Sequence, residues 1–126
     1  MALPKKTSVP ADRLLLYERL VAAVEGTDLK SNFGSAYTAV NGNMYSMISK
    51  HGVVGIRLPA TEHADFLARY KTTVFRADPA WPPAKEYVAV PDGLLGDTEA
   101  LRPWLEASLR HASALKPKPT TRPRNG

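Results

Sequence analysis

The sequence of 126 residues contains no cysteine. This absence excludes disulfides, thiolate zinc sites and thiol catalysis, and it is compatible with the reducing cytoplasm, where we expect the protein to reside. The apolar runs, such as Leu14–Tyr17, are only a few residues long, whereas a bilayer-spanning helix needs about 20 residues, so we expect no membrane span. Lys5 and Lys6 are not followed by an apolar segment, and the N-terminus therefore does not resemble a secretory signal.

The sequence also lacks the common motifs of catalytic, metal-binding and phosphate-binding sites. The three histidines, His51, His63 and His111, do not have the spacing of a known zinc motif. The serines show no Gly-x-Ser-x-Gly pattern, and no glycine-rich turn opens a helix as in a phosphate-binding loop. We therefore expect no catalytic residue, metal site or cofactor. An enzyme would need a pocket assembled from residues distant in the chain, such as Arg57, Glu86 and His51.

The net charge of +5 is concentrated at the two ends of the chain. Lys5 and Lys6 precede the first predicted element, and four basic residues follow the last one: Lys116, Lys118, Arg122 and Arg124. The other 11 basic residues face 12 acidic residues, so the body of the chain is nearly neutral. Basic ends on a neutral body allow weak, sequence-independent nucleic-acid binding, whereas DNA-reading domains carry a basic stripe on a folded face. Solubilising or disordered ends are the alternative.

Hydrophobic patterning in the first half predicts a helix followed by an antiparallel meander. Apolar residues at helical spacing predict a helix from Ser8 to Val24. β-forming runs follow at 36–40, 43–48 and 53–58. The first two are joined by Asn41-Gly42, a strong hairpin signal because both residues accept positive φ. A second turn is expected around His51-Gly52.

The second half predicts a short helix over 61–70, further strands at 72–75 and 85–90, and a helix over 99–115. Pro103 would kink a helix that starts as early as Asp97, so we expect an initial turn and then a regular helix. The expected fold class is α+β, with the helices on one face of the sheet. We expect residues 10–115 to form the domain, 1–9 to be flexible, and the proline-rich, basic 116–126 to be disordered.

The order of these segments resembles the N-terminal domain of the TfoX/Sxy family. In that family a Phe-Gly element precedes a strand, a hairpin turn, an apolar strand and a strand that ends in Arg-Leu. The corresponding residues here are Phe33-Gly34, 36–40, Asn41-Gly42, 44–48 and Arg57-Leu58, and the resemblance continues through 85–91 to Trp104-Leu105. The founding members of the family regulate natural competence, and many carry a separate C-terminal domain. The resemblance implies a regulatory module.

Four residues stand out as candidates for contact with a partner. Tyr37 and Tyr45 lie on the predicted hairpin with Arg57 nearby, a pattern that fits either base stacking or cross-strand packing. Trp81 lies in a proline-rich loop, where it could anchor a partner or cover the core. Open sheet edges also offer a route to a homodimer. We expect a non-enzymatic interaction or regulatory module with a protein partner, with nucleic-acid binding through the basic ends as the alternative.

Overall fold

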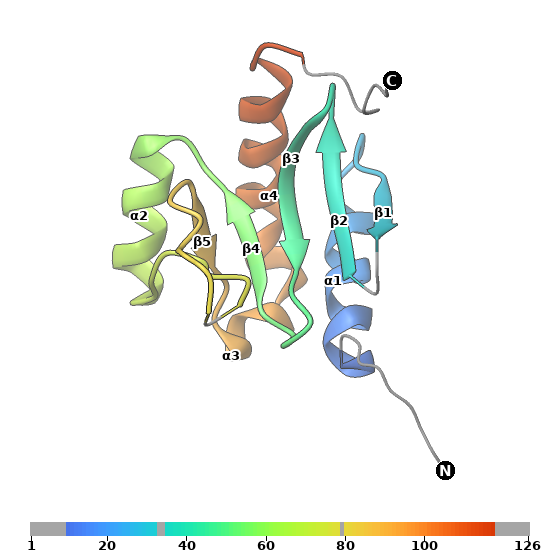
Figure 1. The fold of residues 1–126 in the computed structure, drawn as a ribbon, viewed down its shortest axis with the longest axis vertical. Coiled ribbons are helices and arrows are strands. Elements are labelled where there is room, and N and C mark those ends of the chain that lie inside the picture. Colours follow the sequence, from blue (N-terminus) through green and yellow to red (C-terminus); the bar gives the residue numbers. More distant parts are fainter. Residues whose placement is uncertain (1–9, 33–34, 79, 118–126) are drawn as a thin grey trace.

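The computed structural model describes residues 10–32, 35–78 and 80–117. It contains one five-stranded antiparallel sheet whose strands follow the chain order, which confirms the expected α+β class and meander (Figure 1). The strands are β1 (Leu29–Asn32), β2 (Ser35–Val40), β3 (Asn43–Ile48), β4 (Val54–Arg57) and β5 (Tyr87–Ala89). The sequence did not predict β1, which pairs with β2 at one edge of the sheet.

The two predicted turns of the meander are confirmed. Asn41 and Gly42 have φ values of 53° and 79°, the left-handed conformation that a tight two-residue hairpin requires. Gly52 has a φ of 84° in the turn between β3 and β4. The register between β2 and β3 shifts at Thr38/Ala39, so one residue of β3 is left without a partner.

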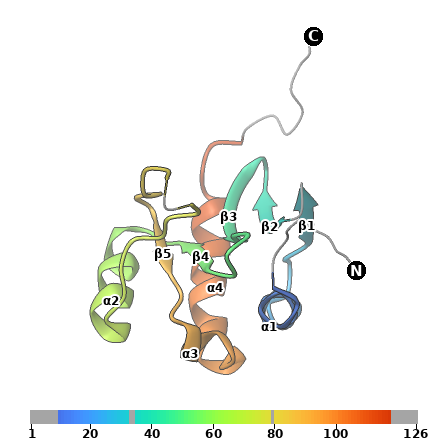
Figure 2. The same cartoon turned by 60° about the horizontal axis from the view of Figure 1, so that its bottom comes forward.

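Helices cover one face of the sheet, as expected (Figure 2). They are α1 (Ala11–Ala23), α2 (Ala60–Tyr70), α3 (Asp92–Leu95) and α4 (Thr98–Ser113). The long α4 contacts β2, β3 and β4, and it packs beside α1. Ser8, the predicted cap of the first helix, lies outside the described residues, and α1 begins directly after Pro10.

The expected irregular start of the last helix is wrong. A continuous helix contains Pro103, and Asp97 caps it by accepting a hydrogen bond from the amide of Ala100 at 3.1 Å. Pro103 lies near the N-terminal end of α4, and its side chain is exposed to solvent. Only a few residues precede it in the helix, so the local loss of one backbone hydrogen bond is tolerated there.

The core between the sheet and the helices is mostly apolar, and it contains a short chain of buried hydroxyls. The phenol of Tyr17 from α1 lies 2.7 Å from Ser46 Oγ, which in turn lies 2.6 Å from Thr38 Oγ1. Burial raises the pKa of Tyr17 above the ordinary tyrosine value, because the charged phenolate would lose its hydration. These bonds satisfy polar groups that β2 and β3 point into the core.

The opposite face of the sheet is covered only in part. Phe75 packs there on Gly55 of β4 and is 1% exposed. The predicted strand over 72–75 is reduced to a single bridge between Val74 and Val88. The predicted strand over 85–90 is shorter, as β5 spans Tyr87–Ala89.

Candidate interaction surface and basic cavity

The sheet face that turns away from the helices carries a mixed aromatic, apolar and basic surface. Tyr37 pairs with Met47 across β2 and β3, and Arg57 pairs with Tyr87 across β4 and β5. These four residues alternate with neighbours that point into the core, and we call them the outer face. Each is partly exposed. No helix among the described residues covers this side of β2 and β3 (Figure 2).

A carboxylate and a backbone carbonyl hold the guanidinium of Arg57 in place. Its Nε donates to Glu86 Oε1 at 2.7 Å, and its Nη1 donates to the carbonyl oxygen of Met44 at 3.3 Å. The phenol of Tyr87 donates to the same carbonyl at 2.8 Å. Burial raises the pKa of Tyr87 to about 12. Arg57 and Tyr87 therefore present a rigid polar edge beside the apolar part of the outer face.

Tyr45 does not belong to this surface. It is 1% exposed and packs in the core, so it is not available for base stacking or for contact with a partner. It also does not pack on Tyr37 across the hairpin, because Tyr37 pairs with Met47. The cause is the register shift between β2 and β3. A bulge places two successive residues of one strand on the same side of the sheet, so Tyr45 and Ser46 are both buried.

Trp81 is exposed, with 59% of its surface accessible, and it does not cover the core. Its loop is held by Asp78, whose carboxylate accepts a hydrogen bond from the amide of Ala80 at 2.9 Å and lies 3.5 Å from the ammonium of Lys50. The hydrogen bond from Ala80, followed by the charge of Lys50, lowers the pKa of Asp78. The Trp81 carbonyl also accepts a hydrogen bond from Arg76. The indole is thus displayed from a tethered loop.

Of the four basic residues proposed for nucleic-acid contact, Lys116 alone is described. It is exposed, and its carbonyl oxygen accepts a hydrogen bond from Asn43 Nδ2 at 3.1 Å. Lys118, Arg122 and Arg124 lie outside the described residues.

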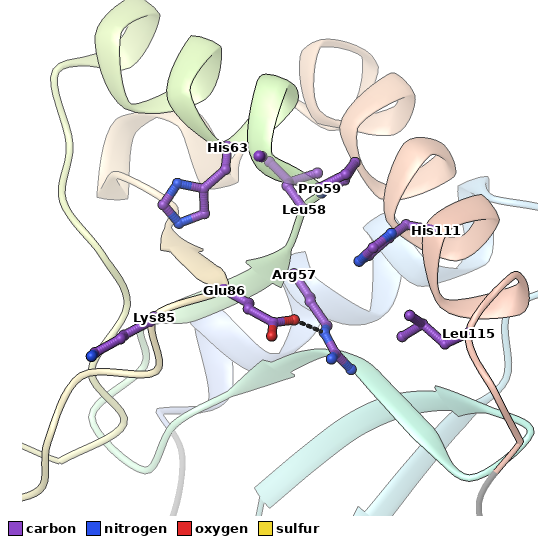
Figure 3. A pocket seen from close by; sticks show the side chains of 9 residues that line it. Arg57, Leu58, Pro59, His63, Lys85, Glu86, His111 and Leu115 are labelled. Carbon is purple, nitrogen blue, oxygen red and sulfur yellow. Dashed lines mark hydrogen bonds and ion pairs between the residues drawn. The ribbon is translucent and has the colours of Figure 1, made fainter.

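Arg57 and Glu86 of the hypothesised pocket do line one cavity, but His51 is not part of it. Arg57 and Glu86 line a cavity of about 510 Å³ together with His63 of α2 and His111 of α4 (Figure 3). His51 lies in the turn at the opposite end of β4. Spacing along the chain could not identify His63 and His111, because they meet through the packing of two helices against the end of the sheet.

The two edges of the sheet differ. Beside β5, the Phe75 amide donates to the Tyr87 carbonyl and the Ala89 amide donates to the Thr73 carbonyl, both at 2.9 Å, so residues 73–75 occupy that edge. The other edge is β1, which pairs only with β2 among the described residues. β1 is therefore the edge strand that could pair with a second copy of the chain.

The described residues contain neither a membrane-spanning helix nor a metal-binding cluster. None of their helices is both long and apolar enough to traverse a bilayer. In the same part of the chain, no three histidine or acidic side chains gather in a way that could hold a metal ion.

Comparison with known protein families identifies the family of this chain. No curated protein matches the chain. The TfoX N-terminal domain matches residues 19–112, which includes the whole sheet, the outer face and the lining of the cavity up to His111. Since this match covers most of the sequence, the chain belongs to the TfoX N-terminal domain family.

Proposed function

We propose that this chain is a non-enzymatic regulatory module that binds a protein partner through its outer face and the neighbouring Trp81 loop. The observation that carries the proposal is the sheet face over β2 and β3, which keeps Tyr37 and Met47 partly exposed where no described helix covers them. Membership of the TfoX N-terminal domain family supports a module of regulatory type.

The chemistry of this surface suits a protein partner. Aromatic residues, methionine and arginine are enriched at protein interfaces, because they bury a large area and lose little conformational freedom when already positioned. Arg57 is pre-positioned by Glu86 and the Met44 carbonyl, and Trp81 is displayed from a loop tied to Lys50 through Asp78. Binding to such a surface requires little rearrangement.

Quantitative affinity purification from the native cell tests this proposal. The full chain is compared with Trp81→Ala, Tyr37→Ser and the matched control Leu15→Ala. Leu15 is a large apolar residue, 53% exposed on α1 and away from the outer face. A partner retained by the wild type and by Leu15→Ala, but depleted about tenfold by either other variant, would support the proposal. Equal recovery on all four baits would contradict it.

The same purification distinguishes protein binding through the outer face from nucleic-acid binding through the basic end. Nuclease treatment and deletion of residues 118–126 should leave the partner bound if the outer face holds it. Recovery that disappears with either treatment, and that falls steeply with salt, would instead assign the association to the basic end. Turnover in a panel of hydrolase and transferase substrates would contradict the non-enzymatic part of the proposal.

Self-association through β1 is a second candidate, because β1 is the edge of the sheet that no described segment blocks. Light scattering across the micromolar range should then show a dimer that Lys30→Pro disrupts. Lys30 lies within β1, and proline interrupts the backbone of this edge strand. A monomeric mass at all concentrations would refute this candidate.

A further inference from the structure

The cavity around Arg57 has an excess of basic side chains. Its basic lining residues are Arg57, His63, Lys85 and His111, and among the described residues that line it Glu86 is the one acidic residue. Glu86 is engaged by Arg57 at 2.7 Å. The described lining residues therefore carry a net charge of +1 when both imidazoles are neutral and +3 when both are protonated.

These basic groups come from three separate elements. His63 projects from α2 and His111 projects from α4 on either side of the Arg57–Glu86 pair, while the Lys85 side chain extends away from that pair (Figure 3). The Nε2 atom of His63 is buried, and no described atom within hydrogen-bond distance pairs with it. A buried polar nitrogen without a partner costs free energy. A rotation of the imidazole that brings this nitrogen to an acceptor on a bound ligand would recover that cost.

The N-terminus of α2 adds backbone donors to the same wall. Pro59 occupies the capping position and no side chain caps the helix there, so the first amides of α2 lack a side-chain acceptor. The first helical bond is donated by the His63 amide to the Pro59 carbonyl. The uncapped end of this 11-residue helix carries partial positive charge toward Pro59 and Ala60, both of which line the cavity.

At the C-terminal end of α4, on the opposite wall, three of the last carbonyls accept backbone hydrogen bonds. The amide of Ala114 bonds to the carbonyls of Arg110 and His111, and the amide of Leu115 bonds to that of Ala112. The rest of the cavity wall is apolar, formed by Leu58, Pro59 and Leu115. A ligand here would place an anionic group among the basic residues and an apolar portion on this wall.

We propose that the cavity binds a small organic phosphate, with its dianionic group held between His63, His111 and Arg57. A phosphate monoester carries nearly two negative charges at neutral pH and several acceptor oxygens, which suits several basic groups together with helix amides. The volume of about 510 Å³ lies in the range of small-molecule sites and leaves room for an organic portion.

The test is a titration of the full chain with phenyl phosphate, followed by two-dimensional amide NMR at constant ionic strength. Inorganic phosphate, benzoate and phenol serve as comparison ligands. Phenyl phosphate should bind saturably, about tenfold more tightly than inorganic phosphate, because its ring buries apolar area on Leu58 and Leu115. The shifted amides should cluster at Ala60, His63 and His111. Benzoate that binds as tightly as phenyl phosphate would overturn the preference for phosphate.

Variants assign the site to these residues. His63→Ala combined with His111→Ala should weaken phenyl phosphate binding at least tenfold, since two charge-assisted hydrogen bonds are lost. Arg110→Gln is the matched control, because Arg110 is the exposed neighbour of His111 on α4, and its affinity should stay within about twofold of wild type. His111→Ala alone, in a partly exposed position, provides the same comparison if the double variant does not fold. Equal affinity in the control and the histidine variants would overturn the site.

Discussion

A methyl group at position 55 has no room in this fold, and Gly55→Ala is therefore the sharpest test of how the outer side of β4 is packed. A Cβ built on Gly55 would lie 2.5 Å from Cγ of Phe75, and 2.6 and 2.8 Å from the two Cδ atoms of its ring. Real Cβ atoms do not approach a ring this closely. Phe75 is 1% exposed and cannot move into solvent without losing its contacts.

The expected cost follows from this overlap. Forcing an extra carbon into a packed site typically costs about 1–3 kcal/mol, whereas replacing glycine by alanine in ordinary extended backbone recovers about 0.4–1 kcal/mol through the unfolded chain. Gly55→Ala should therefore lower the free energy of unfolding by about 1–2 kcal/mol. Phe75→Ala should cost about 3–5 kcal/mol, because it empties a buried aromatic site.

Urea unfolding followed by circular dichroism measures both variants and their combination. Once Phe75 is alanine the added methyl group meets no ring, so Gly55→Ala should cost little in that background, and the two changes should be non-additive by about 1–3 kcal/mol. The matched control is Gly93→Ala, where an added Cβ has no neighbour within 4 Å and the unfolding midpoint should not fall. Additive costs, or a Gly55→Ala protein as stable as wild type, would refute the packing argument.

Two further predictions concern buried polar groups. Ser108→Ala should lower the free energy of unfolding by about 1–2 kcal/mol, because the buried hydroxyl donates to backbone carbonyls of β3 and β4. The control is Ser113→Ala at an exposed position of the same helix, which should change the free energy of unfolding by less than about 0.5 kcal/mol. Equal effects of the two substitutions would contradict this prediction. Stability should also fall as the pH rises above about 10, where unfolded tyrosines ionise, because the folded pKa of Tyr17 is raised and that of Tyr87 is raised to about 12. The stabilisation that comes from burying these neutral phenols is fully present below about pH 10 and is lost as the pH rises toward about 12. Unfolding midpoints measured between pH 8 and 11.5 should decline less steeply in Tyr87→Phe, and an unchanged slope would argue against the burial of this phenol.

The local elements of the fold could be predicted because their signals lie in neighbouring residues. Asn41-Gly42 specifies a tight hairpin through its tolerance of positive φ, and apolar residues at helical spacing specify α1 and α4. The edge strand β1 was missed because Leu29–Asn32 is short and has no alternating pattern, so it is a strand only through its pairing with β2.

The candidate sites depended more strongly on tertiary contacts. Trp81 and Arg57 were identified from the sequence, but the exposure of Trp81 follows from the tethering of its loop by Asp78 and Lys50. Tyr45 was placed on the wrong side, because simple alternation along β3 does not reveal a bulge. A bulge is a property of the paired strands, since it arises where their registers differ by one residue.

The sequence by itself determined the fold class, the turns of the meander and the family, because each depends on residue order, local conformational preference or periodic burial. Tertiary structure alone decided that Phe75 closes over Gly55 and that His63 and His111 join Arg57 in one cavity. These residues lie far apart along the chain, and their meeting depends on where helices pack against the sheet. The absence of cysteine excludes thiol chemistry from this chain, while the packing of its helices and loops forms the outer face and the cavity.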